Sequence, residues 1–402
     1  MNVNIKVFPA KGGDSILVSI DNQKYNILID SGYKSTYYDY IMDEMKCLED
    51  NNKHLDIFII THIDNDHILG GIEFLKNNNL KKNIEIENIL FNGYRQILSK
   101  KNLEKNLDIN YKCRMKEISS SRYFNTDDFE EDFEEDLADV GYSEGESFSE
   151  LLLKGKYNIN RNYYKAVFKH KDNNKNVIEI SNKVKMIILT PTQDDLKDLL
   201  DEWERYLKTE GIEHVVCKES EDAFESFVSN SDDFHEGLND VSNTIFDIEN
   251  LANKNITIEK TITNKSSISF ILIVEKKKYL FLGDAYSDEI LKSLEDLLKY
   301  NLIEDLDFEV LKVPHHGSKN NISSGLLKKV TCKNYIISTN GAHGHPNKET
   351  IAKIIKWNNK CKIYFNYKLD IIDEIKRCRS NKYNFQIISK EDYDSDILEL
   401  NF

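Results

Sequence analysis

The feature that most constrains the fold of this chain is a short apolar segment that runs directly into a polar one. Residues 55–60 read Leu-Asp-Ile-Phe-Ile-Ile, and residues 61–71 continue with Thr-His-Ile-Asp-Asn-Asp-His-Ile-Leu-Gly-Gly. The apolar, β-branched stretch predicts a buried parallel strand, and the Gly-Gly pair predicts a turn that opens a helix. Open α/β sheets place their functional sites where such strands end.

Four side chains that can bind a metal crowd into this polar run: His62, Asp64, Asp66 and His67. Carboxylates packed so closely repel each other unless a cation lies among them. The run therefore predicts a metal site at the carboxyl end of a strand. The alternative is a polar loop in which Asp and Asn serve only as turn formers.

Composition narrows the class of protein. The chain has 402 residues, which suits a single α/β core with insertions, and its net charge of −15 gives no basic footprint for tracking a nucleic-acid backbone. Its six cysteines are scattered without paired spacing, which argues against a disulfide framework and a cysteine zinc site. There is no basic-then-apolar leader and no apolar run near the roughly 20 residues of a membrane span. We therefore expect a cytoplasmic protein with no membrane partner.

Strand patterns recur in two separate parts of the chain, which indicates one core in two halves. We place these halves at about 1–100 and 256–355, with insertions at about 101–175 and 193–255 and a C-terminal extension over 356–402. Within the first insertion, residues 127–136 read Asp-Asp-Phe-Glu-Glu-Asp-Phe-Glu-Glu-Asp. That stretch predicts an amphipathic acidic helix or a disordered tract, and a solvated surface insertion is the plainer alternative.

Three later segments add ligand-type side chains after strand patterns. Residues 281–284 end on Asp284 after a glycine, which suits a bridging carboxylate. Residues 312–318 contain His315 and His316, and residues 340–346 place His345 on a glycine-rich loop. Adjacent side chains of an extended segment point apart, so one of the paired histidines can bind metal while the other serves the substrate or supports a ligand.

Taken together, these motifs resemble the metallo-β-lactamase superfamily. Residues 61–71 are similar to its metal motif in the His-x-Asp-x-Asp-His variant. With residues 28–32, 282–284, 313–318 and 344–346, the set is similar to the metallo-hydrolase domain attached to the ComEC competence channel. The segment 13–17 also falls where those relatives carry comparable residues. The resemblance implies an αβ/βα sandwich of two mixed sheets with helices outside; the acidic, partly helical insertions lie beyond it.

The resemblance also implies a one- or two-metal site at the sheet edge. His62 and Asp64 would hold the first metal, with Asp284 as the bridge and Asp30 as a support that does not bind metal. The second metal would be held by Asp66, His67 and one of the paired histidines, for which we take His316. The catalytic residues would then be Asp66, His315 and His345.

The commoner superfamily motif has histidine at the position of Asp64. A further histidine usually completes the first metal, and it is expected between the two halves of the core. The candidates in that part of the chain are His170, His214 and His235, and none of them follows a clear strand. The first metal position thus has fewer expected ligands than the second.

The mixed nitrogen and oxygen ligand set suits one or two divalent ions, and we expect zinc or manganese. Two metals about 3.5–4 Å apart would activate a bound water and clamp the oxygens of a phosphodiester. We therefore expect a metal-dependent hydrolase, a phosphodiesterase or nuclease that uses a metal-bound hydroxide. Four lysines near the second half of the site offer local positive charge, although solvated surface is their plainer interpretation: Lys312, Lys319, Lys328 and Lys329.

Two alternatives stay open. The same site can take a smaller substrate, such as a small ester, a lactone, a thioester or a nucleotide. The protein can also be an effector or regulatory subunit of a bacterial defence or stress system, with a protein partner on the acidic insertion. Among nucleic acids, a single-stranded end fits the acidic chain better than a long duplex, since unneutralised carboxylates repel the phosphate backbone.

Overall fold

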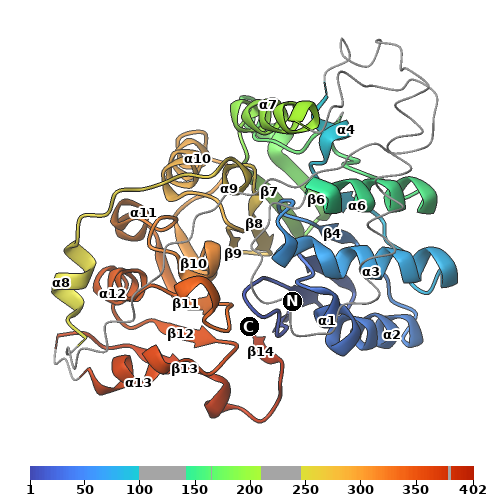
Figure 1. The fold of residues 1–402 in the computed structure, drawn as a ribbon. Coiled ribbons are helices and arrows are strands. Elements are labelled where there is room, and N and C mark those ends of the chain that lie inside the picture. Colours follow the sequence, from blue (N-terminus) through green and yellow to red (C-terminus); the bar gives the residue numbers. More distant parts are fainter. Residues whose placement is uncertain (99–141, 164, 210–245, 379–381) are drawn as a thin grey trace.

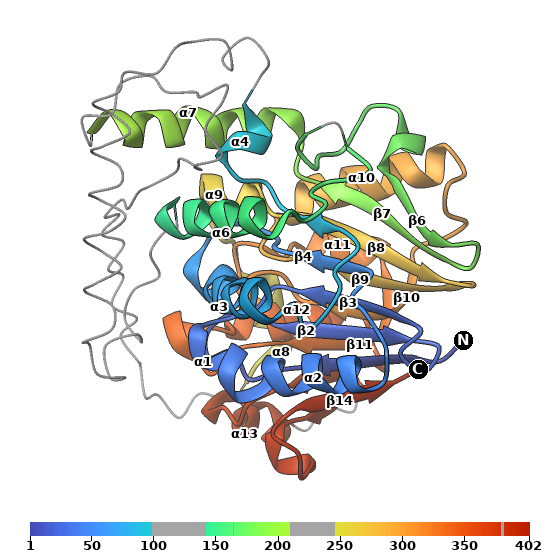
Figure 2. The same ribbon diagram turned by 90° about the vertical axis from the view of Figure 1, so that its right-hand side faces the viewer.

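The computed structural model describes residues 1–98, 142–163, 165–209, 246–378 and 382–402. Two mixed β-sheets pack face to face, and helices cover their outer faces (Figures 1 and 2). The fold class expected from the resemblance, an αβ/βα sandwich of two mixed sheets, is confirmed.

The first sheet has six strands in the order β14-β1-β2-β3-β4-β5. Its strands β3, β4 and β5 are parallel, and its other neighbours are antiparallel. The bounds of its strands are β1 Val3–Val7, β2 Ile16–Ile20, β3 Tyr25–Ile29, β4 Ile57–Ile59, β5 Ile89–Leu90 and β14 Leu398–Asn401.

The second sheet has eight strands in the order β13-β12-β11-β10-β9-β8-β7-β6. Strands β9 to β13 are parallel, and β6 to β9 are antiparallel. The bounds of its strands are β6 Val177–Ser181, β7 Val184–Thr190, β8 Ser269–Val274, β9 Lys277–Phe281, β10 Asp307–Lys312, β11 Thr331–Ile337, β12 Lys362–Phe365 and β13 Gln386–Ile388.

The helices complete the outer layers. Those longer than a single turn, or close to the site, are α1 Lys34–Thr36, α2 Met42–Asp50, α3 Asn65–Lys81, α4 Tyr94–Ile97, α6 Tyr142–Gly155, α7 Gln193–Thr209, α8 Ile248–Asn253, α9 Ile262–Lys265, α10 Ser287–Lys299, α11 Ser324–Lys329, α12 Lys348–Trp357 and α13 Asp370–Arg377. A π-helical turn, Tyr37–Ile41, joins α1 to α2. No helix within the described ranges is long and apolar enough to cross a membrane.

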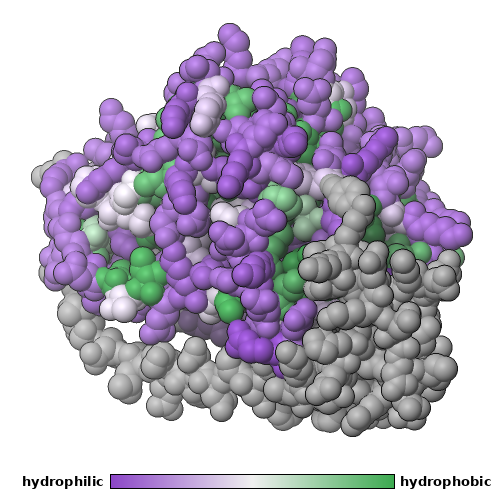
Figure 3. All heavy atoms as spheres, turned by 90° about the horizontal axis from the view of Figure 1, so that it is seen from above, coloured by the Kyte–Doolittle hydropathy of each residue, from purple (hydrophilic) through white to green (hydrophobic). Residues whose placement is uncertain are grey.

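Three layers of apolar side chains hold the sandwich together. Alternate residues of β3 show the arrangement, because Ile27 and Ile29 pack between the sheets while Leu28 packs outward under the helices. In β10, Val310 faces the other sheet and Leu311 faces the helices. Strands covered on both faces are apolar throughout rather than alternating. The face shown in Figure 3 is mostly hydrophilic, with apolar side chains in small separate groups.

The Gly70-Gly71 pair has a different role from the one predicted. Helix α3 begins at Asn65, so both glycines lie inside the helix and the prediction of a turn there is wrong. A Cβ atom on Gly70 would lie 2.1 Å from the carbonyl oxygen of Ser31, and the Gly70 N–H donates to the Gly32 carbonyl at 2.9 Å. Glycine is needed here because the helix approaches the loop after β3 so closely.

We expect Gly70→Ala to destabilise the protein by about 1–3 kcal/mol, the usual cost of forcing an extra carbon into a packed core. The matched control is Gly325→Ala in α11, where the added Cβ has ordinary contacts at 3.5 Å or more. There, alanine should be neutral or slightly stabilising, because it is the better helix former. Urea denaturation of both variants provides the measurement, and equal stability of the two would contradict the close packing at α3.

The later segments of the chain join the same sheets. The segment 356–402 supplies β12 and β13 to one sheet and β14 to the other. Within the ranges given to the insertions, α6 packs on α3, and α7 packs on α4 and α9. The acidic stretch 127–136 lies outside the described residues.

Candidate metal centre

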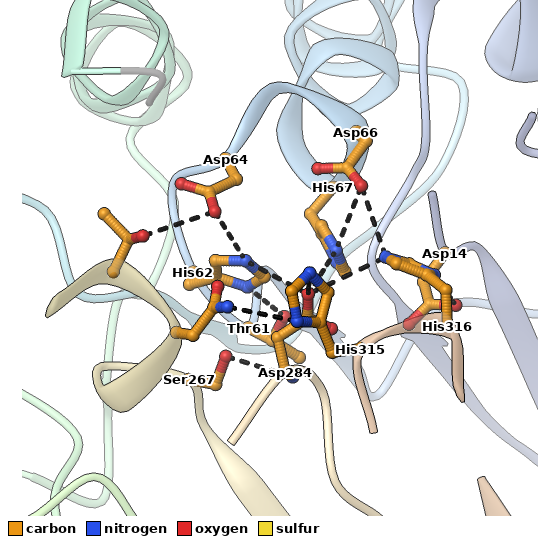
Figure 4. Close-up of polar contacts among 12 residues, drawn as sticks. Asp14, Thr61, His62, Asp64, Asp66, His67, Ser267, Asp284, His315 and His316 are labelled. Carbon is orange, nitrogen blue, oxygen red and sulfur yellow. Dashed lines mark hydrogen bonds and ion pairs between the residues drawn. The ribbon is translucent and has the colours of Figure 1, made fainter. Parts of the chain in front are cut away.

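The predicted ligands meet where strands of both sheets end (Figure 4). His62 follows β4, Asp284 follows β9, and the His315–Gly317 turn follows β10. Helix α3 begins just after His62, and its first turn carries Asp66 and His67. The site is therefore assembled from two halves of the chain that lie on either side of the insertions.

Asp284 lies at the centre of the arrangement. Its carboxylate is almost fully buried, and one oxygen, Oδ2, faces four imidazole rings. This oxygen lies 3.6 Å from Nε2 of His67, 3.7 Å from that of His316, 3.8 Å from that of His315 and 3.9 Å from that of His62. The structure thus places Asp284 where a bridging carboxylate was expected.

The other two carboxylates divide the ligands into two groups. Asp64 Oδ2 lies 3.2 Å from Nε2 of His62. Asp66 Oδ2 lies 3.2 Å from Nε2 of His316 and 3.7 Å from Nε2 of His67. We call His62 and Asp64 the first group. We call Asp66, His67 and His316 the second group. All six predicted ligands are brought together, and their assignment to particular ions stays a prediction.

A metal ion fits this cluster because its polar atoms lack other partners. Nε2 of His62, His67 and His316 is buried without a hydrogen bond, as is Oδ1 of Asp64 and of Asp284. Buried polar atoms are nearly always paired, and leaving them unpaired costs free energy. Three bare ring nitrogens beside carboxylate oxygens form the mixed donor set of a divalent transition metal. The cluster therefore suits a divalent ion.

Hydrogen bonds outside the cluster orient the rings of His62 and His67. Asp30 Oδ2 lies 2.9 Å from Nδ1 of His67 and accepts from the Thr61 hydroxyl at 2.8 Å. That hydroxyl lies 3.0 Å from Nδ1 of His62. Both rings thus carry their proton on Nδ1 and present a bare Nε2 to the centre, as metal-binding histidines do. The resemblance gives Asp30 a supporting role, which stays a prediction, and the structure places its carboxylate against His67 and Thr61.

The second histidine of the His-His pair is the better placed ligand. Nδ1 of His316 donates to the Ser338 carbonyl at 3.0 Å, which leaves its Nε2 toward Asp66 and Asp284. Both histidines of the pair have positive φ, 47° for His315 and 53° for His316. Non-glycine residues adopt this region only where the surroundings compel it, which is common at functional sites.

The carboxylates of the cluster strongly raise the pKa values of His67 and His316. Burial by itself lowers the pKa of His67, but Asp66, Asp284 and Asp30 raise it well above its ordinary value. Burial likewise opposes protonation of His316, and Asp284 and the other carboxylates raise its pKa to about 9. Without a cation these rings therefore carry protons, and a metal has to displace them, so binding weakens in acid.

Asp14 is a neighbour of the cluster to which sequence reasoning gave no role. One of its oxygens, together with atoms of His67, Asp284 and His316, forms a set that lies within 4.8 Å of one another. Its other oxygen pairs with Lys312. The signal in the sequence was the Gly-Asp-Ser stretch in residues 13–17, which the resemblance pointed to without assigning a function.

Lys312 is not part of a substrate-binding surface. Its side chain is 2% exposed and pairs with Asp14 beneath the cluster. Both interpretations made from sequence, local positive charge for the substrate and solvated surface, are therefore wrong for this lysine. Lys329 pairs with Glu295 at 3.3 Å, and Lys328 lies over the Trp357 ring.

The proposed catalytic histidines lie beside the cluster. Asn321 donates to the Asp284 carbonyl at 2.7 Å, so its Oδ1 accepts from Nδ1 of His315 at 3.0 Å. The ring of His345 packs edge-on against that of His315, with centroids 5.0 Å apart. Burial lowers the pKa of His315, and burial together with the neighbouring histidines holds the pKa of His345 well below its ordinary value.

The further histidine expected for the first metal is not found among the described residues. His170 packs against the rings of Tyr163 and Phe168, with centroids 5.6 and 4.3 Å away, and belongs to no ligand group in the described part of the chain. His214 and His235 lie outside the described residues.

Comparison with known proteins finds one family model that matches part of the chain. Residues 9–141 match the family model of the metallo-beta-lactamase superfamily. The crystal structure of the metallo-beta-lactamase fold protein YhfI from Bacillus subtilis aligns with 100% of this chain and 99% of that chain, at 9% identity and a TM-score of 0.39. No curated protein gave a significant match. Residues 9–141 are thus similar to the metallo-beta-lactamase superfamily, and the likeness to the ComEC-attached domain stays a prediction.

The two histidines of the pair can be separated by mutation. We expect His316→Ala to remove metal from the second group, since its Nε2 faces two carboxylates there. His315→Ala should retain the metal of that group and lose turnover instead. Metal content by elemental analysis, measured beside kcat, checks both. If His315→Ala lost the metal and His316→Ala kept it, His315 would be the ligand instead of His316.

Proposed function

We propose that the protein is a metal-dependent hydrolase of phosphodiesters. The observation that carries this proposal is the convergence of the bare Nε2 atoms of His62, His67 and His316 on the Asp284 carboxylate. In the proposal, His62 and Asp64 would hold one ion and the second group would hold another, and Asp284 is the carboxylate that both groups would share.

A divalent ion bound there lowers the pKa of a coordinated water and neutralises charge on phosphate oxygens. The residues of the chain supply position and hydrogen bonds. Asp30 and Ser338 fix the tautomers of His67 and His316, so that their bare nitrogens face the centre. His315 and His345 are neutral at neutral pH because burial lowers the pKa of each. A neutral ring can accept a proton or orient a substrate oxygen, so we assign them these roles rather than that of an acid.

Two features favour a phosphodiester over other substrates, and a third bears on the form that such a substrate takes. The first is Asp64, since a carboxylate in place of an imidazole favours harder ions, which bind phosphate oxygens well. The second is the arrangement of the first and second groups around the shared Asp284 carboxylate. This arrangement suits two ions that hold the attacking and the leaving oxygen of a phosphodiester. The third is the net charge of −15, which favours short or single-stranded substrates over a long duplex.

The test is a substrate screen with added Mn²⁺ or Zn²⁺. The panel contains bis-p-nitrophenyl phosphate, single- and double-stranded DNA and RNA, a nucleotide, a thioester, a lactone and a β-lactam. We expect turnover of the phosphodiesters, with single strands preferred, and no turnover by His67→Ala prepared in parallel. Turnover confined to the thioester, lactone or β-lactam would overturn the proposal in favour of a small-ester hydrolase.

A further inference from the structure

An aromatic cluster lies directly behind the loop that carries the first group. Trp203 of α7 is fully buried, and its ring lies 4.9 Å from that of Tyr142 in α6 and 5.7 Å from that of Tyr94 in α4. We call Tyr94, Tyr142, Gly145 and Trp203 the Trp203 cluster. Helices α6 and α7 lie within the ranges of the two insertions, so at this cluster a described helix from each insertion range meets the core (Figures 1 and 2).

The cluster contacts the loop between the two ligands of the first group. Ile63 is buried in the same apolar core as Trp203. A Cβ atom placed on Gly145 would lie 3.2 Å from Cη2 of Trp203 and 3.4 Å from Cγ2 of Ile63. The indole ring and the Ile63 side chain therefore both lie beside the same point of the α6 backbone, within one apolar core. Because Ile63 packs into the cluster, its position fixes that of its neighbours His62 and Asp64.

A second contact reaches Asp64 from α9. The Thr263 hydroxyl donates to Asp64 Oδ2 at 3.3 Å. Helix α9 in turn packs on α7, where Lys265 pairs with Asp198 at 3.5 Å. Helix α7 thus supports Asp64 both through Ile63 and through the helix that carries Thr263.

The contacts that orient the second group come from core strands, whereas the first group combines one core contact, the Thr61 hydroxyl at His62, with the contacts of Ile63 and Thr263. His67 is oriented by Asp30, and His316 by the Ser338 carbonyl, and both partners follow core strands. His67, His316 and Asp284 also belong to the compact ligand set, whereas His62 and Asp64 do not. Loss of a contact made by the insertions should therefore affect one group and spare the other.

We propose that the Trp203 cluster is a positioning device for the first metal position, through which the two insertions set whether the enzyme holds one ion or two. This inference rests on the metal centre of the proposed function. The inference concerns the metal affinity of the first position relative to that of the second. It does not depend on which ester is hydrolysed.

The test compares Trp203→Ala, Trp203→Phe and Trp357→Ala in the full chain. Trp357 is the only other tryptophan of the sequence and lies at the end of α12, so it is a matched control. Bound Co²⁺ is titrated by its visible absorption, and ions per chain are counted by elemental analysis. We expect two ions in the wild type and in Trp357→Ala. Trp203→Ala should weaken the first position by roughly 10–100-fold, the usual effect of losing a support of a metal ligand, and leave the second position unchanged.

Trp203→Phe should recover most of the first-position affinity, because it restores an aromatic ring against Ile63. If Trp203→Ala does not fold, Gly145→Ala serves instead, since the three atoms nearest to its Cβ belong to the indole ring and to Ile63. Unchanged affinities in these variants, or an equal loss at both positions, would overturn the proposal while leaving the metal centre in place. A wild type that binds one ion would also overturn it, and one that binds none would overturn the proposed function as well.

Discussion

Replacing Asp284 by alanine is expected to remove both metal ions and nearly all activity. Its Oδ2 lies within 3.9 Å of Nε2 in four histidines, so it is the carboxylate that both groups share. Metal ions supply several kcal/mol of transition-state stabilisation, and each 1.4 kcal/mol corresponds to about tenfold in rate. We therefore expect kcat to fall by roughly 10³-fold or more.

The readouts are elemental analysis of the purified variant and its rate with bis-p-nitrophenyl phosphate. Asp288→Ala is the matched control, because this carboxylate lies four residues further on, in α10, and pairs with Lys260 at the surface. It should keep the metal and the activity. An Asp284→Ala protein that still holds two ions would show that the two groups bind metal independently of the shared carboxylate.

The second large effect concerns stability. We expect Lys312→Met to lower the free energy of unfolding by about 3–5 kcal/mol, because it leaves the buried Asp14 carboxylate without its cation. Burial alone would raise the pKa of Asp14, but Lys312, followed by His316, lowers it to about 2. A lowered carboxyl pKa stabilises the fold above the ordinary value of 3.8, and this contribution is lost as the pH falls toward 2.

Urea denaturation at neutral pH measures the effect. The double variant Asp14→Leu/Lys312→Met should recover a large part of the loss, since replacing a whole buried ion pair by apolar side chains is often close to neutral. A double variant less stable than Lys312→Met would mean that the carboxylate makes a stabilising contact of its own, with His316 as the candidate.

The predicted ligands could be found from sequence because each of them follows a strand. Apolar runs mark the strands, and the parallel strands β9 and β10 bring Asp284 and His316 to one edge of the second sheet, where His62 at the end of β4 in the first sheet also lies. The sequence offered no physical reason to take His316 rather than His315 as the ligand, because the orientation of the pair depends on positive φ values and on the Ser338 carbonyl, which is distant in sequence. Pattern alone does not reveal such contacts.

Other features also depend on tertiary contacts that local patterns do not contain. A Gly-Gly pair is typical of a turn, and only the approach of α3 to Ser31 explains its place inside a helix. Lys312 ends a strand as a surface lysine would, and only the fold brings Asp14 beneath it. Trp203 lies among helix-forming residues, but its contact with Ile63 joins parts of the chain that are far apart in sequence.

The pairing of β14 with β1 has a consequence for how the chain folds during synthesis. The two strands are joined at one end by Val3 and Phe402, whose N–H groups donate to each other's carbonyls at 2.9 and 2.8 Å. At about 5–20 residues per second, the ribosome needs roughly 20–80 s to make the chain between them. During that time β1 keeps an open edge, and open edges pair readily with other chains. Slower growth at low temperature, or added chaperone, should therefore improve the yield of folded protein more than changes to the metal supply.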